Sequence, residues 1–245
     1  MGIAYGALKF LFDEGKKERW HGKLLTLGKQ DIAVTIDNLN RAALENSYVL
    51  GNPGKPLHSE KEADAIRGYL RDEWFFKALG FSSVRSMDMS GYEYADIIHD
   101  LNNPEPPPHC NEAYDLVLDG GTLEHVFHIP NALACVARMV RSGGRIIHIS
   151  PMSNFADHGF YSFSPTLFVD YYSTNRFTIE KIVYIRFERD PCADPWFYYD
   201  YTGNSMANLE AGVYFMLACV RKLPNSTWDR LPQQGYYVRN GWRAE

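Results

Sequence analysis

The sequence predicts an α/β fold, with a mostly parallel, doubly wound sheet and helices on both of its faces. Three observations lead to this prediction. Short apolar, strand-like runs alternate with amphipathic segments of helical period. The run 114–118 is nearly all apolar, as expected of a strand covered on both faces. The chain has 245 residues, 45% of them hydrophobic, which suits one domain spanning residues 1–245.

The first half of the chain contains one clear strand and one predicted helix. The apolar run KLLTL at 23–27 is the first strand, and Gly28 follows it. A polar helix is predicted over 59–79, because its start has the spacing of a capping box and Gly80 stands where a helix ends. We therefore expect the segment 32–82 to be a helical insertion.

The second half repeats the strand and helix pattern. A helix is predicted from 129 to 141, because Pro130 suits the first helical position and the apolar residues share one face. The turn Gly143-Gly144 is expected to end this helix. The other predicted elements are strands at 83–87, 95–99, 145–150, 179–187 and 212–220, a helix at 165–174, and an irregular aromatic-rich tail at 223–245.

Composition and charge exclude several classes of function. The net charge of −5 disfavours electrostatic capture of nucleic acid. No apolar run approaches the roughly 20 residues that span a bilayer, and the N-terminus lacks the basic start of a secretory signal. The four cysteines are scattered, without a C-x-x-C pair, so reduced thiols are expected. We therefore expect a cytoplasmic protein with no nucleic-acid or membrane partner.

Glycine and aspartate follow successive predicted strands. These residues are Gly28, Asp88, Asp100, Asp119 and Gly120. Ligands of open α/β sheets bind beyond the carboxyl ends of the strands, where an aspartate after the second strand suits a ribose diol. Aspartate is also common wherever a strand becomes a loop, so any one of these positions has a plain structural explanation. Taken together, they predict a site for a nucleoside.

Three stretches resemble the motifs of the Rossmann-like S-adenosylmethionine-dependent methyltransferases. They are YDLVLDGGTLEHVFHIPNALACVARMVRSGGRIIHISP, VRSMDMS and ADIIHDLN. The resemblance implies S-adenosylmethionine as cofactor, with Asp88 and Met89 at its ribose and Asp100 and Leu101 at its adenine. It also implies a Rossmann-like sheet that ends with a late antiparallel strand.

The sequence differs from this family at the first motif. Three spaced glycines usually follow the first strand, whereas KLLTLGKQD has only Gly28. One interpretation is an altered loop, in which Gly28, Lys29 and Gln30 hold the cofactor together with Asp119 and Gly120. The other is weakened binding, with the fold serving a non-catalytic purpose. We favour the first, because the acidic residues and Gly120 are kept.

The candidate catalytic residues lie on two loops. Glu124 and His125 follow the strand 114–118, and His158 follows the strand 145–150. A histidine suits a general base, which transfer of a methyl group to oxygen would need. Each residue also has a structural alternative, in which the first two cap a helix or hold the loop and His158 donates a hydrogen bond in a turn. No metal site is predicted, because the histidines lack metal-binding spacing.

The sequence also suggests where the acceptor binds. Asn154, Phe160 and Tyr161 are predicted to line a substrate pocket beside His158. The aromatic cluster 196–201 is compatible with a lid over the acceptor, with a surface buried in a homodimer, or with core packing.

The leading hypothesis is a methyltransferase acting on oxygen of a small-molecule or glycan-type acceptor. The alternative is a non-catalytic, methyltransferase-like binding protein. A nucleotide-dependent oxidoreductase is disfavoured, because no G-x-G-x-x-G follows the first strand.

Overall fold

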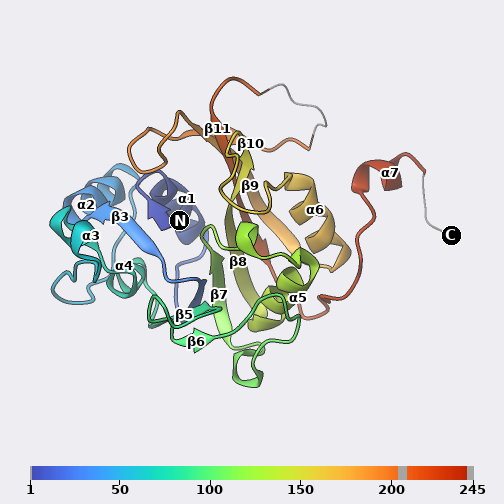
Figure 1. Ribbon diagram of the computed structural model, residues 1–245, viewed down its shortest axis with the longest axis horizontal. Helices are drawn as coiled ribbons and strands as arrows, with labels where there is room; N and C mark the ends of the chain where they lie inside the picture. The colour runs from blue at the N-terminus through green and yellow to red at the C-terminus, as the bar shows by residue number, and fades with distance from the viewer. Residues whose placement is uncertain (1, 204–208, 242–245) are drawn as a thin grey trace.

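An eight-stranded sheet forms the centre of the computed structural model, which describes residues 2–203 and 209–241 (Figure 1). The strand order is β10-β9-β11-β8-β7-β2-β5-β6. The strands are β2 (Lys23–Leu27), β5 (Ser83–Asp88), β6 (Ile97–Ile98), β7 (Tyr114–Asp119), β8 (Val140–Ser153), β9 (Thr178–Phe187), β10 (Phe197–Asp200) and β11 (Val213–Arg221).

The sheet has the predicted doubly wound topology. From β2 the chain moves outward to β5 and β6, returns to β7 on the other side of β2, and continues to β8, all in parallel pairing. β11 then inserts antiparallel between β8 and β9. The predicted fold class, including the late antiparallel strand, is thereby confirmed.

Helices cover both faces of the sheet, which separates the core into two halves. On one face, α1 (Ala7–Lys17) and α4 (Asp72–Leu79) share a buried cluster with Leu24 and Leu116, and α2 (Ile36–Glu45) joins this cluster through its contact with α1. On the other face, the helices α5 and α6 pack over Leu25 and Val117. Figure 1 shows α5 (Ile129–Met139) and α6 (Pro165–Thr174) on the opposite side of the strands from α1. Adjacent residues of one strand therefore point into different halves of the core, as period-2 geometry requires.

The first part of the chain differs most from the sequence prediction. A small sheet of order β1-β3-β4 joins β1 (Gly2–Ala4) to β3 (Asp31–Thr35) and β4 (Tyr69–Leu70). The segment 32–82 therefore contributes strands as well as helices. The predicted continuous helix over 59–79 is wrong, because β4 separates α3 (Glu62–Ile66) from α4.

Glycine explains where this segment breaks. Gly68 has a φ of +76°, in the left-handed region, and stands between α3 and β4. A glycine in this conformation commonly ends a helix, so α3 stops here although the capping box at 59–62 suggested a longer helix. Gly80, with a φ of +131°, is the C-cap of α4, as expected.

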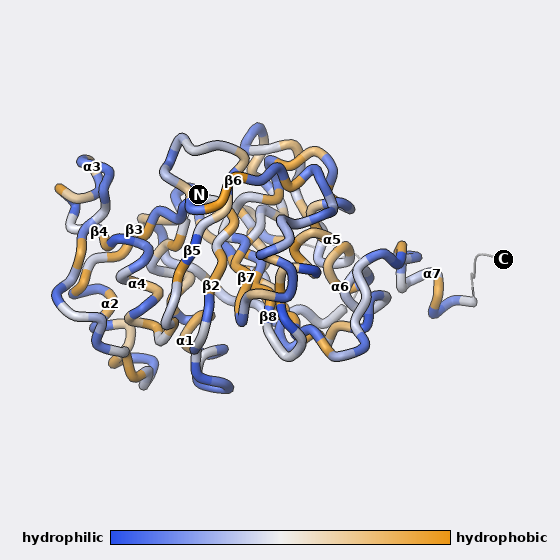
Figure 2. The backbone as a smooth tube through the Cα atoms, turned by 90° about the horizontal axis from the view of Figure 1, so that it is seen from below, coloured by the Kyte–Doolittle hydropathy of each residue, from blue (hydrophilic) through white to orange (hydrophobic). Residues whose placement is uncertain are grey.

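Most later boundaries agree with the prediction to within a few residues. β8 begins at Val140, directly after α5, so Gly143 and Gly144 lie inside the range of this strand rather than before it. The strand expected at 95–99 is reduced to Ile97–Ile98. The tail contains a five-residue helix, α7 (Gly235–Arg239), which extends from the body of the molecule in Figures 1 and 2.

The edge strand β10 lies entirely within the aromatic cluster 196–201. Tyr198 donates a hydrogen bond from its hydroxyl to the carbonyl of Gly6 (2.6 Å), and Trp196 stacks on Phe187. These two rings are partly buried against the core, whereas Phe197 is exposed.

Two further properties of the described residues bear on the sequence predictions. None of their helices has both the length and the apolar character needed to cross a bilayer. All four cysteines are free thiols; Cys110, Cys135 and Cys219 are buried, and Cys192 is exposed between β9 and β10.

We predict that Gly80→Ala destabilises the protein more than Gly54→Ala. Both glycines have positive φ, but a Cβ on Gly80 would lie 2.5 Å from the carbonyl oxygen of Trp20, whereas Gly54 has no atom within 4 Å. We expect Gly54→Ala to lower the free energy of unfolding by about 1–2 kcal/mol, and Gly80→Ala by a further ~1–3 kcal/mol. Urea denaturation measures both; equal losses would contradict this account of Gly80.

Candidate functional site

A cavity of about 310 Å³ lies beyond the carboxyl ends of β2, β5, β6 and β7. This is where the strand order reverses, between β2 and β7, the usual ligand position in a doubly wound sheet. The lining residues are Gly28, Lys29, Gln30, Met87, Asp88, Met89, Glu93, His99, Asp100, Leu101, Asn102, Gly121, Thr122, His125 and Val126.

Most of the predicted cofactor residues line this one cavity. The predicted residues at or after the ends of β2, β5 and β6 line the cavity, whereas the two predicted residues at the end of β7 do not. The residues at the cavity are Gly28, Lys29, Gln30, Asp88, Met89, Asp100 and Leu101. Asp119 and Gly120 are absent from its lining.

Gly28 allows the backbone to turn at the end of β2. Its φ is +72°, and its N–H donates to the carbonyl of Met87 (2.7 Å). A Cβ here would lie 3.1 Å from Oγ1 of Thr122, whose hydroxyl donates to the carbonyl of Leu27 (2.7 Å). The loops after β2 and β7 are therefore fastened to each other, and a side chain at Gly28 would be both strained and crowded.

The side chain of Gln30, in the loop where the related family usually has further glycines, packs against Gly120. This side chain is buried, and Nε2 donates to the carbonyl of Leu27 (2.8 Å). A Cβ on Gly120 would lie only 2.1 Å from Oε1 of Gln30, so the absence of a side chain at Gly120 leaves room for Gln30. Within residues 2–203 and 209–241, Oε1 has no hydrogen-bond partner. Oε1 of Gln30 is therefore a buried acceptor without a donor, next to Gly120.

The two aspartates at the cavity each form a tight turn. Oδ1 of Asp88 accepts from the N–H of Ser90 (3.1 Å), and Oδ1 of Asp100 accepts from the N–H (2.9 Å) and the side-chain amide (2.7 Å) of Asn102. These bonds fix the carboxylates but occupy only one oxygen of each. The remaining acceptor capacity is suited to hydroxyl or amino groups of a ligand.

Asp119 is buried beneath the cavity and satisfied by protein donors. Its Oδ2 lies 2.9 Å from Nδ1 of His148, and Oδ1 accepts from the N–H groups of Thr122 (3.0 Å) and Leu123 (3.2 Å). His148 in turn meets the hydroxyl of Tyr172 at 2.7 Å. Asp119 therefore holds the loop after β7, and His148 is a buried residue that bridges Asp119 and Tyr172.

Glu124, His125 and His158 come together beside the cavity. Glu124 is fully buried, and burial, reinforced by the negative charge of Asp119, raises its pKa to about 8. Its Oε1 lies 3.5 Å from Nε2 of His158 and 4.0 Å from Nε2 of His125. Burial lowers the pKa of both histidines, and for His158 the neighbouring His125 adds to this effect.

The loop after β8 is tied to the backbone of Glu124. The N–H of Phe160 donates to the carbonyl of Glu124 (2.8 Å), and a Cβ on Gly159 would lie 2.7 Å from the same oxygen. Tyr161 donates from its hydroxyl to the carbonyl of Phe127 (2.8 Å). This close approach is how His158, distant in sequence, reaches the carboxyl group of Glu124.

The predicted substrate residues do not line the cavity beside the strands. Asn154 uses its amide to donate to the carbonyl of Gly212 (2.7 Å). Phe160 is 65% exposed and packs edge-on against Phe127. Asn154, Phe160 and Tyr161 belong to the same loop as His158.

Several lining residues were not predicted from the sequence. Gly121 and Thr122 follow β7, and Asn102 follows β6, so position after a parallel strand was a usable signal for all three. Glu93 carries no such signal, because it stands in the loop between β5 and β6. His99 also lines the cavity.

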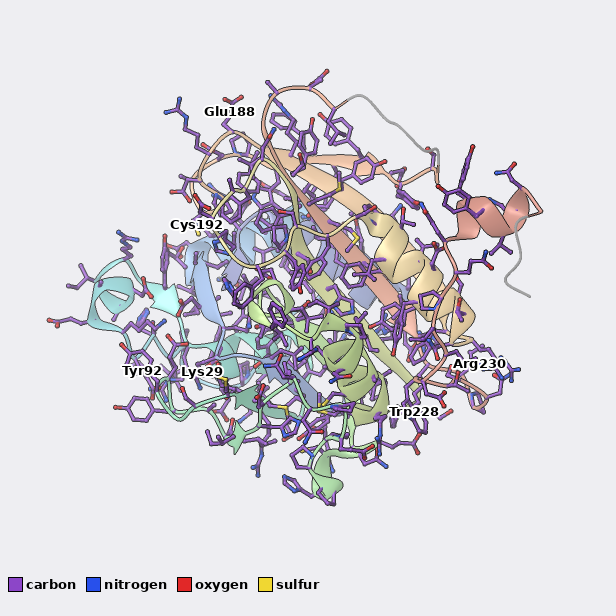
Figure 3. All side chains as sticks on the ribbon, turned by 45° about the vertical axis from the view of Figure 1, so that its right-hand side comes forward. Lys29, Tyr92, Glu188, Cys192, Trp228 and Arg230 are labelled. Carbon is purple, nitrogen blue, oxygen red and sulfur yellow. The ribbon has the colours of Figure 1, made fainter. Side chains whose placement is uncertain are left out.

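A second hollow of about 570 Å³ adjoins the first. It shares Lys29, Gln30 and Glu93 with it and is also lined by Tyr92 and Asp72. Figure 3 shows Lys29 and Tyr92 on the same side of the molecule. Nζ of Lys29 lies 3.3 Å from the carboxylate of Asp72, which places a paired positive charge between the two hollows.

Comparison with known proteins identifies similar folds at low identity. No protein-family model and no curated protein matches the sequence. The YcgJ protein from Bacillus subtilis aligns at 10% identity over 89% of this chain and 98% of its own (TM-score 0.47). An S-adenosylmethionine-dependent methyltransferase from Thermotoga maritima aligns at 14% over 90% of each chain (TM-score 0.41). The 1,6-didemethyltoxoflavin-N1-methyltransferase from Burkholderia thailandensis aligns at 12%, over 89% and 78% respectively (TM-score 0.42).

We predict that Gly120→Ala destabilises the protein because of Gln30. The φ of Gly120 lies outside the left-handed region, so its backbone tolerates a side chain and the cost comes from the contact with Oε1. Gly120→Ala should lower the free energy of unfolding by about 1–3 kcal/mol, and Gln30→Ala by ~1 kcal/mol through its lost hydrogen bond. The double variant should lose less than the sum in urea denaturation. Additive losses would show that the two residues do not meet.

Proposed function

We propose that this protein is an S-adenosylmethionine-dependent methyltransferase that acts on an oxygen atom of a small-molecule or glycan-type acceptor. The observation that carries the proposal is the convergence of Gly28, Asp88 and Asp100 on one cavity. They end three neighbouring parallel strands, in the order that a nucleoside site requires. The motif resemblance supports the same cofactor.

The residues at the cavity fit the parts of this cofactor. The free oxygen of Asp88 suits a ribose hydroxyl, and Asp100, next to Leu101, suits the exocyclic amine and ring of adenine. A volume of about 310 Å³ is at the lower end of the range for ligand pockets.

When bound, S-adenosylmethionine supplies an electrophilic methyl group on a sulfonium with a good leaving group. The protein's main task is then to hold the acceptor atom in line and close to that carbon. For an oxygen acceptor, a side chain must also take the proton. His125 lines the cavity and His158 lies next to it, so these imidazoles, with Glu124 between them, are our candidates for that step.

The alternative is a non-catalytic binding protein with the same fold. The buried side chain of Gln30 favours this alternative, because it occupies space over Gly120. The two functions differ in whether the cavity binds cofactor, which a direct binding measurement resolves.

We predict that Asp88→Ala weakens binding of S-adenosylhomocysteine. Loss of a hydrogen bond to a charged carboxylate should cost roughly 1–3 kcal/mol, or about 5- to 150-fold in Kd. Isothermal titration calorimetry measures this effect, and Asp37→Ala, an exposed acidic residue on α2, is the matched control.

Two outcomes would contradict the proposal. Equal affinity of the Asp88→Ala variant and the unchanged protein would remove Asp88 from the site. Absence of binding by the unchanged protein at millimolar ligand would favour the non-catalytic alternative.

A further inference from the structure

The carboxyl group of Glu124 has an unusual environment. Its side chain is fully buried, and in the described part of the chain neither Oε1 nor Oε2 has a hydrogen-bond partner. An ionised carboxylate buried without a partner is costly, and most buried carboxylates are paired or bind a metal ion. This orphaned group therefore points to a cationic ligand.

Two imidazole nitrogens are directed at the same oxygen. Nε2 of His158 lies 3.5 Å and Nε2 of His125 lies 4.0 Å from Oε1 of Glu124. Nε2 of His158 is itself buried and has no hydrogen-bond partner among the described residues. The three ligating atoms all lie within 4.8 Å of one another, close enough to surround one ion.

We infer that Glu124, His125 and His158 form a binding site for one divalent transition-metal ion such as Zn²⁺. Zinc takes imidazole nitrogen and carboxylate oxygen at about 2.0–2.2 Å, and sites with three protein ligands keep a position open. The donor set of two imidazoles and one carboxylate suits such an ion better than Mg²⁺ or Ca²⁺, which prefer oxygen. This inference departs from the expectation of no metal, which was drawn from residue spacing, because the three side chains come together only in the fold.

The surrounding structure holds the three ligands in place. Glu124 and His125 belong to the short 3-10 turn Leu123–His125, and the bond from Phe160 to the carbonyl of Glu124 fixes the other loop. Phe155 packs on the ring of His158, with 4.3 Å between ring centroids, and also on the core. A site assembled from fixed elements needs little rearrangement to bind an ion.

A second cluster shows the contrast. Glu14, Glu180 and Cys219 also lie within metal-ligand distance of one another. There, however, Lys17 lies 2.6 Å from Glu14, and Arg221 lies 2.5 Å from Glu180. Protein cations already neutralise these carboxylates, whereas no lysine or arginine in the described residues pairs with Glu124.

The open position of the metal would face the cavity, because His125 is both a ligand and a lining residue. With Nε2 on the metal, neither imidazole would itself take the acceptor's proton; the ion would instead bind the acceptor's oxygen atom and lower the pKa of its hydroxyl, so that the proton passes to solvent. This role, unlike the site itself, rests on the proposed function. An acceptor with a hydroxyl group as a metal ligand is the substrate class that such an arrangement favours.

The test is a titration of the full-length, chelator-treated protein with Co²⁺, followed by its visible absorption bands. We expect one equivalent to bind, Zn²⁺ to displace it, and millimolar Mg²⁺ to leave it bound. Glu124→Gln and His158→Gln should each weaken binding by at least ~10-fold. His109→Gln, at an exposed histidine outside the cluster, should leave the affinity unchanged.

Thermal melting supplies a second readout. Zn²⁺ should raise the Tm of the unchanged protein and leave that of Glu124→Gln unaltered, since only a ligand bound to the folded state stabilises it. Without metal, Glu124→Gln should be folded and at least as stable, because it removes a buried ionisable group and keeps its shape. The inference is overturned if Co²⁺ does not bind at 1 mM, a roughly saturating level for such sites, or binds the variants equally well.

Calorimetry with S-adenosylhomocysteine on the same samples separates the two proposals. Metal binding without nucleoside binding would overturn the proposed function and leave the metal site standing. Nucleoside binding without metal binding would overturn the metal site alone.

Discussion

The buried carboxylate of Asp119 is the constraint on which the candidate site depends. It ends β7 and is held by His148 on β8, while its other oxygen accepts from the backbone N–H groups of Thr122 and Leu123. A charge at full burial is tolerated only with several such partners. Because the partners include the loop itself, the same interaction turns the chain sharply after β7 and delivers Glu124 and His125 beside the cavity.

The charge of Asp119 also adds to the effect of burial in raising the pKa of Glu124. Protein donors satisfy both carboxylate oxygens of Asp119. Its negative charge disfavours ionisation of the nearby carboxyl group of Glu124, in addition to the effect of burial. The N–H of Phe160 donates to the backbone carbonyl of Glu124 and so fixes the main chain at this residue. Two carboxyl groups are thus kept close inside the protein, one fully paired and the other without a partner. Such an imbalance is typical of functional sites rather than of packing alone.

The sequence was informative where local pattern and strand position decide the structure. The strands β2, β5 and β7 have apolar runs, and their carboxyl ends meet at one edge, so Gly28 and Asp88 could be placed from residue order alone. The small sheet β1-β3-β4 could not, because β1 and β4 have only three and two residues and its pairing joins distant segments. The grouping of Glu124 with His158 depends on a contact between two loops, which the hydrophobic pattern of the sequence does not predict. The burial of Asp119 depends on its contact with His148 on the neighbouring strand.

The exposed Cys192 has a practical consequence. The other three thiols are buried, and this one stands on the loop between β9 and β10, labelled in Figure 3 on a different part of the surface from Lys29. Alkylation of the native protein with a maleimide fluorophore should therefore attach one dye at a defined place without any engineered substitution. Cys192 is thus a natural site for attaching a fluorophore for optical spectroscopy.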